Sequence, residues 1–190
     1  MRAGAGPAVR TPAHEKGCED GPGSRAILLG LGNPLYGDDG AGIEALRLFE
    51  TRYRRPPGLD VVDGGTQGIA LLGIIEDAPA LVIVDAMVGQ AEPGTVAELE
   101  AAELIGGSGL KLSEHQVDVR EVLALAAWRR RLPRRLRLVG VVAGRLDPGV
   151  GLSDPVRRAL PAVVDAAAAW LRRWGVPVER RGGAGREEGR

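Results

Sequence analysis

The stretch ALVIVD, residues 80–85, decides the fold class of this chain. Its five consecutive apolar residues are too few for a typical helix, and such a run is typical of a strand that is buried on both faces of a parallel sheet. The run ends in a carboxylate, Asp85. In open α/β sheets ligands bind beyond the carboxyl ends of the strands, so Asp85 is either a cap for the next turn or a site residue, and its position favours the site.

Strands and helices alternate on both sides of this run. Shorter apolar runs predict further strands at residues 26–29, 59–63 and 136–142, and an alternating strand at 94–100. Apolar residues at helical spacing predict helices at residues 43–53, 69–75, 117–128 and 153–174. This order predicts a single α/β domain with three layers, α/β/α, built on a mostly parallel twisted sheet with an antiparallel edge strand.

The two ends of the chain differ from the predicted domain, which spans residues 25–175. Residues 1–24 and 176–190 are rich in Gly, Pro or charge and show no apolar periodicity, so we expect both to be flexible tails. The N-terminus has no signal-peptide core, and no stretch reaches the roughly 18 apolar residues of a membrane span. We therefore expect a cytoplasmic protein with no membrane contact.

Charge and cysteine content exclude several kinds of partner and site. Lys+Arg and Asp+Glu both number 25, so the net charge gives no indication of a nucleic-acid or membrane partner. A basic cluster at residues 129–137 is interpreted as a solvated connection, with a docking patch for an acidic partner as the less favoured reading. The single cysteine, Cys18, can form neither an internal disulfide nor a thiolate metal site, so the chemistry must use oxygen and nitrogen.

A glycine-rich loop with two aspartates follows the first predicted strand. It reads GLGNPLYGDDGAG at residues 30–42, and Asp38 and Asp39 directly precede the first predicted helix. One aspartate could cap that helix while the other is solvated. For Asp38 we favour such a structural role over a role in the site. For Asp39 the two roles are equally favoured. A phosphate loop is a weaker alternative, because the spacing differs from Gly-x-Gly-x-x-Gly and two carboxylates would repel an anion.

One histidine lies in the predicted domain, His115. Ser113 and Gln116 have capping-box spacing, which puts His115 in the first turn of a helix, where the helix dipole favours a neutral imidazole. Asp39, Asp85 and His115 together make an oxygen and nitrogen ligand set at one end of the sheet, suited to nickel or zinc. No serine stands in a nucleophile elbow, so the residues alone indicate a metal-dependent hydrolase or a metal binder.

Five segments resemble the [NiFe]-hydrogenase maturation endopeptidases, and they stand in that family's order across residues 27–174. They are GLGNPLYGDDGAG at 30–42, DGGTQG at 63–68, VDAM at 84–87, SEHQ at 113–116 and LVGVVAGRLDPGVGLS at 138–153. The resemblance implies an endopeptidase that removes the C-terminal extension of the hydrogenase large-subunit precursor after nickel has been inserted. It also implies that no classical protease nucleophile is used.

The same resemblance assigns roles to particular residues. It places the nickel contacts and the catalytic role on Asp39, Asp85 and His115, with aspartate at the first position where many members carry glutamate. It places substrate recognition on Asp63, Gly64, Gly65 and Thr66, although Thr66 could instead cap the following helix. We expect the nickel to be presented by the substrate, with zinc or cadmium able to replace it in crystals, and the protein to be a monomer.

Two other functions remain open at this point. Peptidyl-tRNA hydrolases also begin with a Gly-Leu-Gly-Asn-Pro strand end, but they place a histidine shortly afterwards, where this chain has Asp38 and Asp39. A nickel chaperone without catalysis would use the same three ligands. Incubation with a nickel-loaded precursor separates these functions, because only the endopeptidase shortens the precursor.

Overall fold

The computed structural model describes residues 25–106, 111–112 and 119–182. Its elements alternate between strands and helices, as the apolar patterns predict. In chain order they are β1 (Ala26–Leu31), the 3-10 helix η1 (Gly37–Gly40), α1 (Ala41–Arg52), β2 (Tyr53–Arg54), β3 (Leu59–Gly65), the 3-10 helix η2 (Gly68–Leu71), α2 (Leu72–Asp77), β4 (Ala80–Val88), β5 (Val96–Glu100), α3 (Ala101–Gly106), β6 (Lys111–Leu112), α4 (Val119–Trp128), β7 (Arg135–Val142), α5 (Asp154–Arg173) and β8 (Glu179–Arg180).

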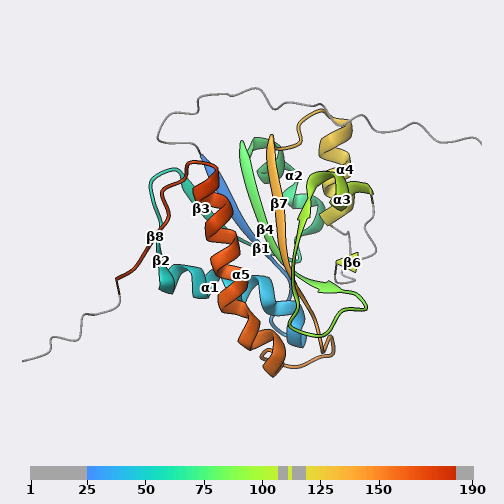
Figure 1. The fold of residues 1–190 in the computed structure, drawn as a ribbon. Helices are drawn as coiled ribbons and strands as arrows, with labels where there is room; N and C mark the ends of the chain where they lie inside the picture. Colours follow the sequence, from blue (N-terminus) through green and yellow to red (C-terminus); the bar gives the residue numbers. More distant parts are fainter. Residues whose placement is uncertain (1–24, 107–110, 113–118, 183–190) are drawn as a thin grey trace, which may run out of the picture.

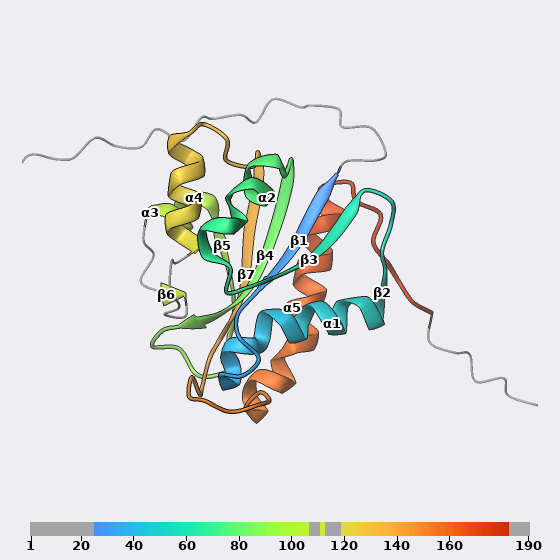
Figure 2. The same ribbon diagram turned by 180° about the vertical axis from the view of Figure 1, so that it is seen from behind.

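The main sheet has the order β3-β1-β4-β7-β5, and β6 adds to β4 off this path. β3, β1, β4 and β7 are parallel, whereas β5 runs antiparallel to β7 at the edge. The predicted mostly parallel sheet with an antiparallel edge strand is therefore confirmed. The loops that leave the carboxyl ends of β1 and β7 lie together at the lower end of the molecule in Figure 1 and in the opposite view of Figure 2.

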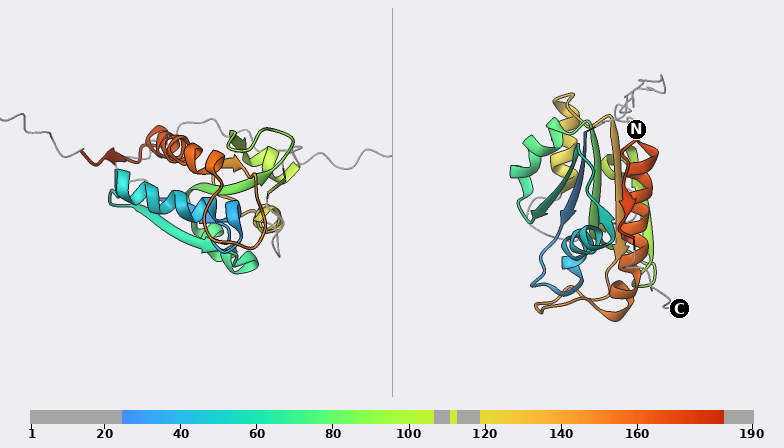
Figure 3. Two further views of the ribbon diagram at one scale, coloured as in Figure 1. Left: turned by 90° about the horizontal axis from the view of Figure 1, so that it is seen from below. Right: turned by 90° about the vertical axis from the view of Figure 1, so that its left-hand side faces the viewer.

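Helices cover both faces of the sheet, which gives the predicted three layers. α1 and α5 lie on one face and α2, α3 and α4 on the other, and the right-hand view of Figure 3 shows α5 and the α2–α4 pair on opposite sides of the strands. β4 is the central strand, and its residues 80–87 are all buried. This double burial explains why the run at residues 80–85 has no alternating polar positions.

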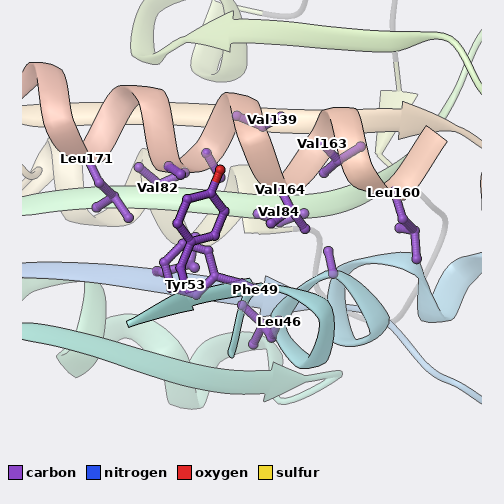
Figure 4. Close-up of a cluster of buried hydrophobic side chains, with 14 of the residues drawn as sticks. Leu46, Phe49, Tyr53, Val82, Val84, Val139, Leu160, Val163, Val164 and Leu171 are labelled. Atoms are coloured by element: carbon purple, nitrogen blue, oxygen red, sulfur yellow. The ribbon is translucent and has the colours of Figure 1, made fainter. Parts of the chain in front are cut away.

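The core beneath α1 and α5 is the larger of the two apolar clusters. The predicted stripe of α5 is buried in it and meets Phe49 and Tyr53 of α1 and β2 across the face of β4 and β7, as Figure 4 shows. Phe49 and Tyr53 stack with ring centroids 5.2 Å apart. The members of the stripe are Val156, Leu160, Val163, Val164 and Ala167.

The basic cluster at residues 129–137 supports the fold rather than forming a separate patch. Arg129 and Arg131 pair with Glu76 at the end of α2, and Arg131 also reaches Asp77. Arg137 pairs with Glu100. These contacts agree with the interpretation of this segment as a solvated connection.

The prediction of a flexible tail from residue 176 is wrong for residues 176–182. Val176 and Val178 are buried in the α1–α5 cluster, and β8 pairs antiparallel with β2, as seen on the left of Figure 1. Arg180 donates to Asp165 at 2.6 Å. This docking is hard to predict from the sequence, because only two apolar side chains, set among Pro and charged residues, anchor the segment. The domain thus extends to at least residue 182.

Truncation after residue 175 is therefore expected to destabilise the protein. It removes two fully buried valines, each worth about 1.5–3 kcal/mol of burial, so the melting temperature should fall by roughly 6–24 °C. Truncation after residue 182 keeps both valines and β8, and it serves as the matched control. Equal melting temperatures for the two truncated chains, measured by circular dichroism, would show that the docked segment contributes nothing.

Candidate active site

Asp39 is held in the tight connection between β1 and α1. Its side chain is fully buried, and its Oδ2 accepts a hydrogen bond from the Asn33 backbone N–H at 2.6 Å. Gly32 has φ +118, and a Cβ at that position would lie 1.7 Å from the carbonyl oxygen of Asp39. The glycine is thus required by close backbone approach, and the loop holds the carboxylate at the carboxyl end of β1.

Asp38 is neither a helix cap nor a solvated residue, so the interpretation favoured for it from the sequence is wrong. Its side chain is fully buried. Oδ2 accepts from the N–H groups of Gly144 and Arg145 and from the Ser153 hydroxyl, at 2.8, 2.9 and 2.8 Å, and Oδ1 accepts from the Ser153 N–H at 2.6 Å. Asp38 therefore ties η1 to the loop between β7 and α5.

Asp85 lies inside β4 rather than at its end, since the strand continues for three residues to Val88. The side chain is 5% exposed, and its Oδ1 accepts from the Ala86 N–H at 2.7 Å. Among the otherwise apolar residues of this buried strand, a charged carboxylate is costly unless it is used or well paired. Asp85 nevertheless lies near the carboxyl end of the sheet, as predicted.

The structure brings the elements that carry Asp39 and Asp85 together. η1 contacts β4, and the first turn of α1 lies so close to β4 that a Cβ at Gly42 would be 2.4 Å from the Val84 carbonyl oxygen. Asp39 precedes that glycine by three residues, and Asp85 follows Val84 directly. The two buried carboxylates are thus supplied from adjoining elements at one end of the sheet.

His115 lies outside the described residues, as do Ser113 and Gln116. The described chain on its N-terminal side is β6, whose Leu112 pairs with Met87 of β4, two residues beyond Asp85. Within residues 25–106, 111–112 and 119–182, no group of three His, Cys, Asp or Glu side chains is placed to hold a metal ion. The described residues contribute two carboxylates to the predicted ligand set, and the role of His115 stays a prediction.

The segment Asp63–Thr66 borders the same loop. Asp63 Oδ1 accepts from the Gly65 N–H at 3.0 Å, which closes a tight turn in which Gly65 has φ +47. The Gly65 carbonyl accepts from the Gly32 N–H at 3.0 Å, so this turn is bonded to the loop that carries Asp39. Thr66 is exposed and does not cap η2, whose preceding residue is Gln67 and which has no side-chain cap.

Ser153 is the single serine among the described residues, and its hydroxyl is engaged as a donor to Asp38. No histidine lies in the described part of the chain to activate it. The structure therefore gives this serine a positioning role instead of the role of a nucleophile activated by a base. The Asp38–Ser153 contact could not be predicted from local patterns, because it joins residues 115 positions apart that only the fold brings together.

Comparison with known proteins shows the family of this chain. A family model described as hydrogenase maturation protease (HycI) matches residues 43–170. The chain belongs to the hydrogenase maturation protease family. The match covers Asp63, Asp85 and His115, whereas Asp39 lies just before it.

Individual members of the family cover most of the chain. The hydrogenase expression/formation protein HupD of Rhizobium leguminosarum bv. viciae is 37% identical over 84% of this chain and 80% of its own length. The hydrogenase 2 maturation protease of Escherichia coli K12 is 34% identical over 80% of this chain and 93% of its own length.

The solved structures show the same fold in this protease family. The hydrogenase maturating endopeptidase HybD from E. coli superposes with a TM-score of 0.76 at 33% identity, covering 83% of this chain and 98% of that one. The [NiFe] hydrogenase maturation protease HybD from Thermococcus kodakarensis gives a TM-score of 0.63 at 30% identity, covering 76% and 97%. The Gly-Leu-Gly-Asn-Pro segment thus belongs to a hydrogenase maturation protease and not to a peptidyl-tRNA hydrolase. None of the helices in the described part of the protein is long and apolar enough to cross a membrane.

Proposed function

We propose that this hydrogenase maturation protease removes the C-terminal extension of a [NiFe]-hydrogenase large-subunit precursor that already carries nickel. The observation that carries the proposal is the pair of buried carboxylates, Asp39 and Asp85, on adjoining elements at the carboxyl end of the sheet. Among its described residues, this protease offers no serine that a base activates. It therefore needs another way to act on the peptide bond.

Asp39 and Asp85 suit the docking of a metal-bearing substrate. Carboxylate oxygens and a neutral imidazole are suitable ligands for a borderline divalent ion, and without thiolates they leave the metal with its own protein. β6, which ends three residues before His115 in the sequence, pairs with β4 at Met87, and this supports His115 as the third ligand. Nickel bound to the precursor would supply a Lewis acid next to the bond that is cut.

The positions of the two carboxylates also support a role in orientation. The backbone N–H of Asn33 holds Asp39, and the N–H of Ala86 holds Asp85, so one oxygen of each side chain is fixed by the fold. Pre-positioned ligands of this kind lower the cost of aligning a substrate. The Asp63–Thr66 turn is bonded to the Asp39 loop, and this bond supports a role for the turn in contacting the substrate chain. We propose that the protein acts as a monomer in the cytoplasm.

A size-shift assay tests the proposed function. Purified protein incubated with a nickel-loaded large-subunit precursor should shorten it by the length of one C-terminal peptide, which mass spectrometry identifies together with the cleaved bond. A nickel chaperone would bind the precursor and leave its mass unchanged. Unchanged mass after prolonged incubation with the matching precursor would contradict the proposed function.

A further inference from the structure

Large apolar side chains that face solvent are concentrated at one end of this protein. In the part of the chain that the structure describes, seven large hydrophobic residues are more than a third exposed, and six of them end or follow a strand at its carboxyl end. The exception is Trp128, which ends α4 just before β7 begins. The six are Leu35, Tyr36, Ile69, Val88, Leu146 and Val150.

Four of these residues lie on two loops that are bonded to each other. We call Leu35, Tyr36, Leu146 and Val150 the two-loop surface; the first two follow β1 and the others follow β7. The Gly149 N–H donates to the Leu35 carbonyl and the Gly37 N–H to the Gly149 carbonyl, both at 2.8 Å. The two loops run side by side below the sheet in Figures 1 and 2.

The backbone beneath the two-loop surface is fixed from within the protein. Asp38 accepts from Gly144, Arg145 and Ser153, so both loops are anchored to one buried carboxylate. Leu152, one residue before Ser153, is buried in the α1–α5 cluster. A loop whose backbone is already ordered loses little further backbone entropy when a partner covers it, which favours its use in binding.

The charged groups of the loop between β7 and α5 lie close to each other and stay partly exposed beside the apolar side chains. The Arg145 guanidinium donates to the Gly151 carbonyl at 2.9 Å and lies 3.5 Å from Asp147. Leu35 and Val150 are 62% and 81% exposed. Clustered exposed apolar side chains beside a candidate site are typical of a protein-binding surface.

The two-loop surface is continuous with the candidate active site. The Asn33 N–H donates to Asp39, the Asn33 side chain accepts from the Leu35 N–H at 3.0 Å, and the Asp39 N–H donates to the Tyr36 carbonyl at 3.2 Å. One turn therefore carries both the carboxylate and two members of the surface. A chain that brings its peptide bond to Asp39 therefore comes near Leu35 and Tyr36, which belong to the same turn.

We propose that the two-loop surface docks an apolar segment of the hydrogenase large-subunit precursor next to the cleaved extension. This inference rests on the proposed function and adds the protein contact that a few metal ligands alone do not supply. Apolar contact with residues away from the reacting bond contributes equally to the substrate complex and the transition state, so its loss raises KM and leaves kcat unchanged.

Leu35→Asp and Val150→Asp, singly and together, test the docking surface. With nickel-loaded precursor, the double variant should raise KM about tenfold, which corresponds to ~1.4 kcal/mol, and change kcat less than about twofold. Its melting temperature should match that of the unaltered protein, because both side chains are exposed. Trp128→Asp, an equally exposed apolar position at the other end of the sheet, should leave KM unchanged. An unchanged KM in the double variant overturns the inference.

Direct binding separates failure of this inference from failure of the proposed function. Biolayer interferometry with immobilised precursor should show a Kd about tenfold higher for the double variant than for the unaltered protein, whether or not the precursor is cleaved. If no cleavage occurs but this difference remains, the proposed function fails and the docking surface stands. The docking surface is overturned if the two proteins have equal Kd values, or if the unaltered protein does not bind. It is also overturned if the unaltered protein self-associates and only the double variant abolishes this self-association.

Discussion

Asp85→Asn is expected to lower the rate of precursor cleavage by roughly 100-fold or more, because a metal contact is worth several kcal/mol in the transition state. The same loss is expected for Asp39→Asn. Both substitutions preserve shape and retain an oxygen that can accept the hydrogen bond seen in the structure, from Ala86 in one case and Asn33 in the other. They remove only the negative charge that would face a cation.

The fold should tolerate these two substitutions. A neutral amide is cheaper to bury than a carboxylate, so the melting temperature should stay within about 3 °C of the unaltered protein or rise. Asp77→Asn is a matched control, because Asp77 is an exposed aspartate at the end of α2. Cleavage by Asp85→Asn within about tenfold of the unaltered rate, measured under single-turnover conditions, would remove Asp85 from the proposed ligand set.

Asp38→Asn is expected to cause the largest loss of stability among single isosteric substitutions at this end of the sheet. The carboxylate satisfies three N–H groups and one hydroxyl through two oxygens. An amide has one acceptor oxygen, so its NH2 group must face a buried N–H. Hydrogen bonds to charged groups are worth about 1.5–3 kcal/mol each, and the expected loss is about 3 kcal/mol of unfolding free energy.

Urea unfolding measures this loss and separates it from a catalytic effect. Asp147→Asn, in the same loop, removes only an exposed ion pair with Arg145 and should change the unfolding free energy by less than about 1 kcal/mol. Since Asp38 also anchors the two-loop surface, the Asp38→Asn variant should show a raised KM at temperatures where it remains folded. Stability equal to that of the Asp147→Asn control would contradict the role of Asp38 as the residue that ties the two loops together.

The fold could be predicted from the sequence wherever one physical pattern dominated. The run at residues 80–85 required a strand buried on both faces, and the stripe from Val156 to Ala167 required a helix with one buried side. Both patterns depend on apolar periodicity, which is local. The docking of Val176 and Val178 was missed because two valines are too few to show any period.

The candidate site was only partly predictable for a similar reason. The position of Asp85 near the carboxyl end of the sheet followed from the general rule for open α/β sheets, although β4 continues for three residues beyond it. Asp38 and Asp39 are adjacent and chemically identical, so local patterns could not show that Asp38 anchors the loop, and only the family resemblance assigned Asp39 to the site. That distinction depends on Gly144, Arg145 and Ser153, which approach Asp38 only in the folded protein.

The central claim, that nickel carried by the substrate permits cleavage, is tested most directly by comparing two forms of one precursor. The nickel-loaded and nickel-free forms are incubated with the purified protein, the latter in the presence of a chelator, and the released peptide is quantified by mass spectrometry. We expect release of the extension from the nickel-loaded form alone. Release of the peptide from the nickel-free form at a comparable rate would contradict it.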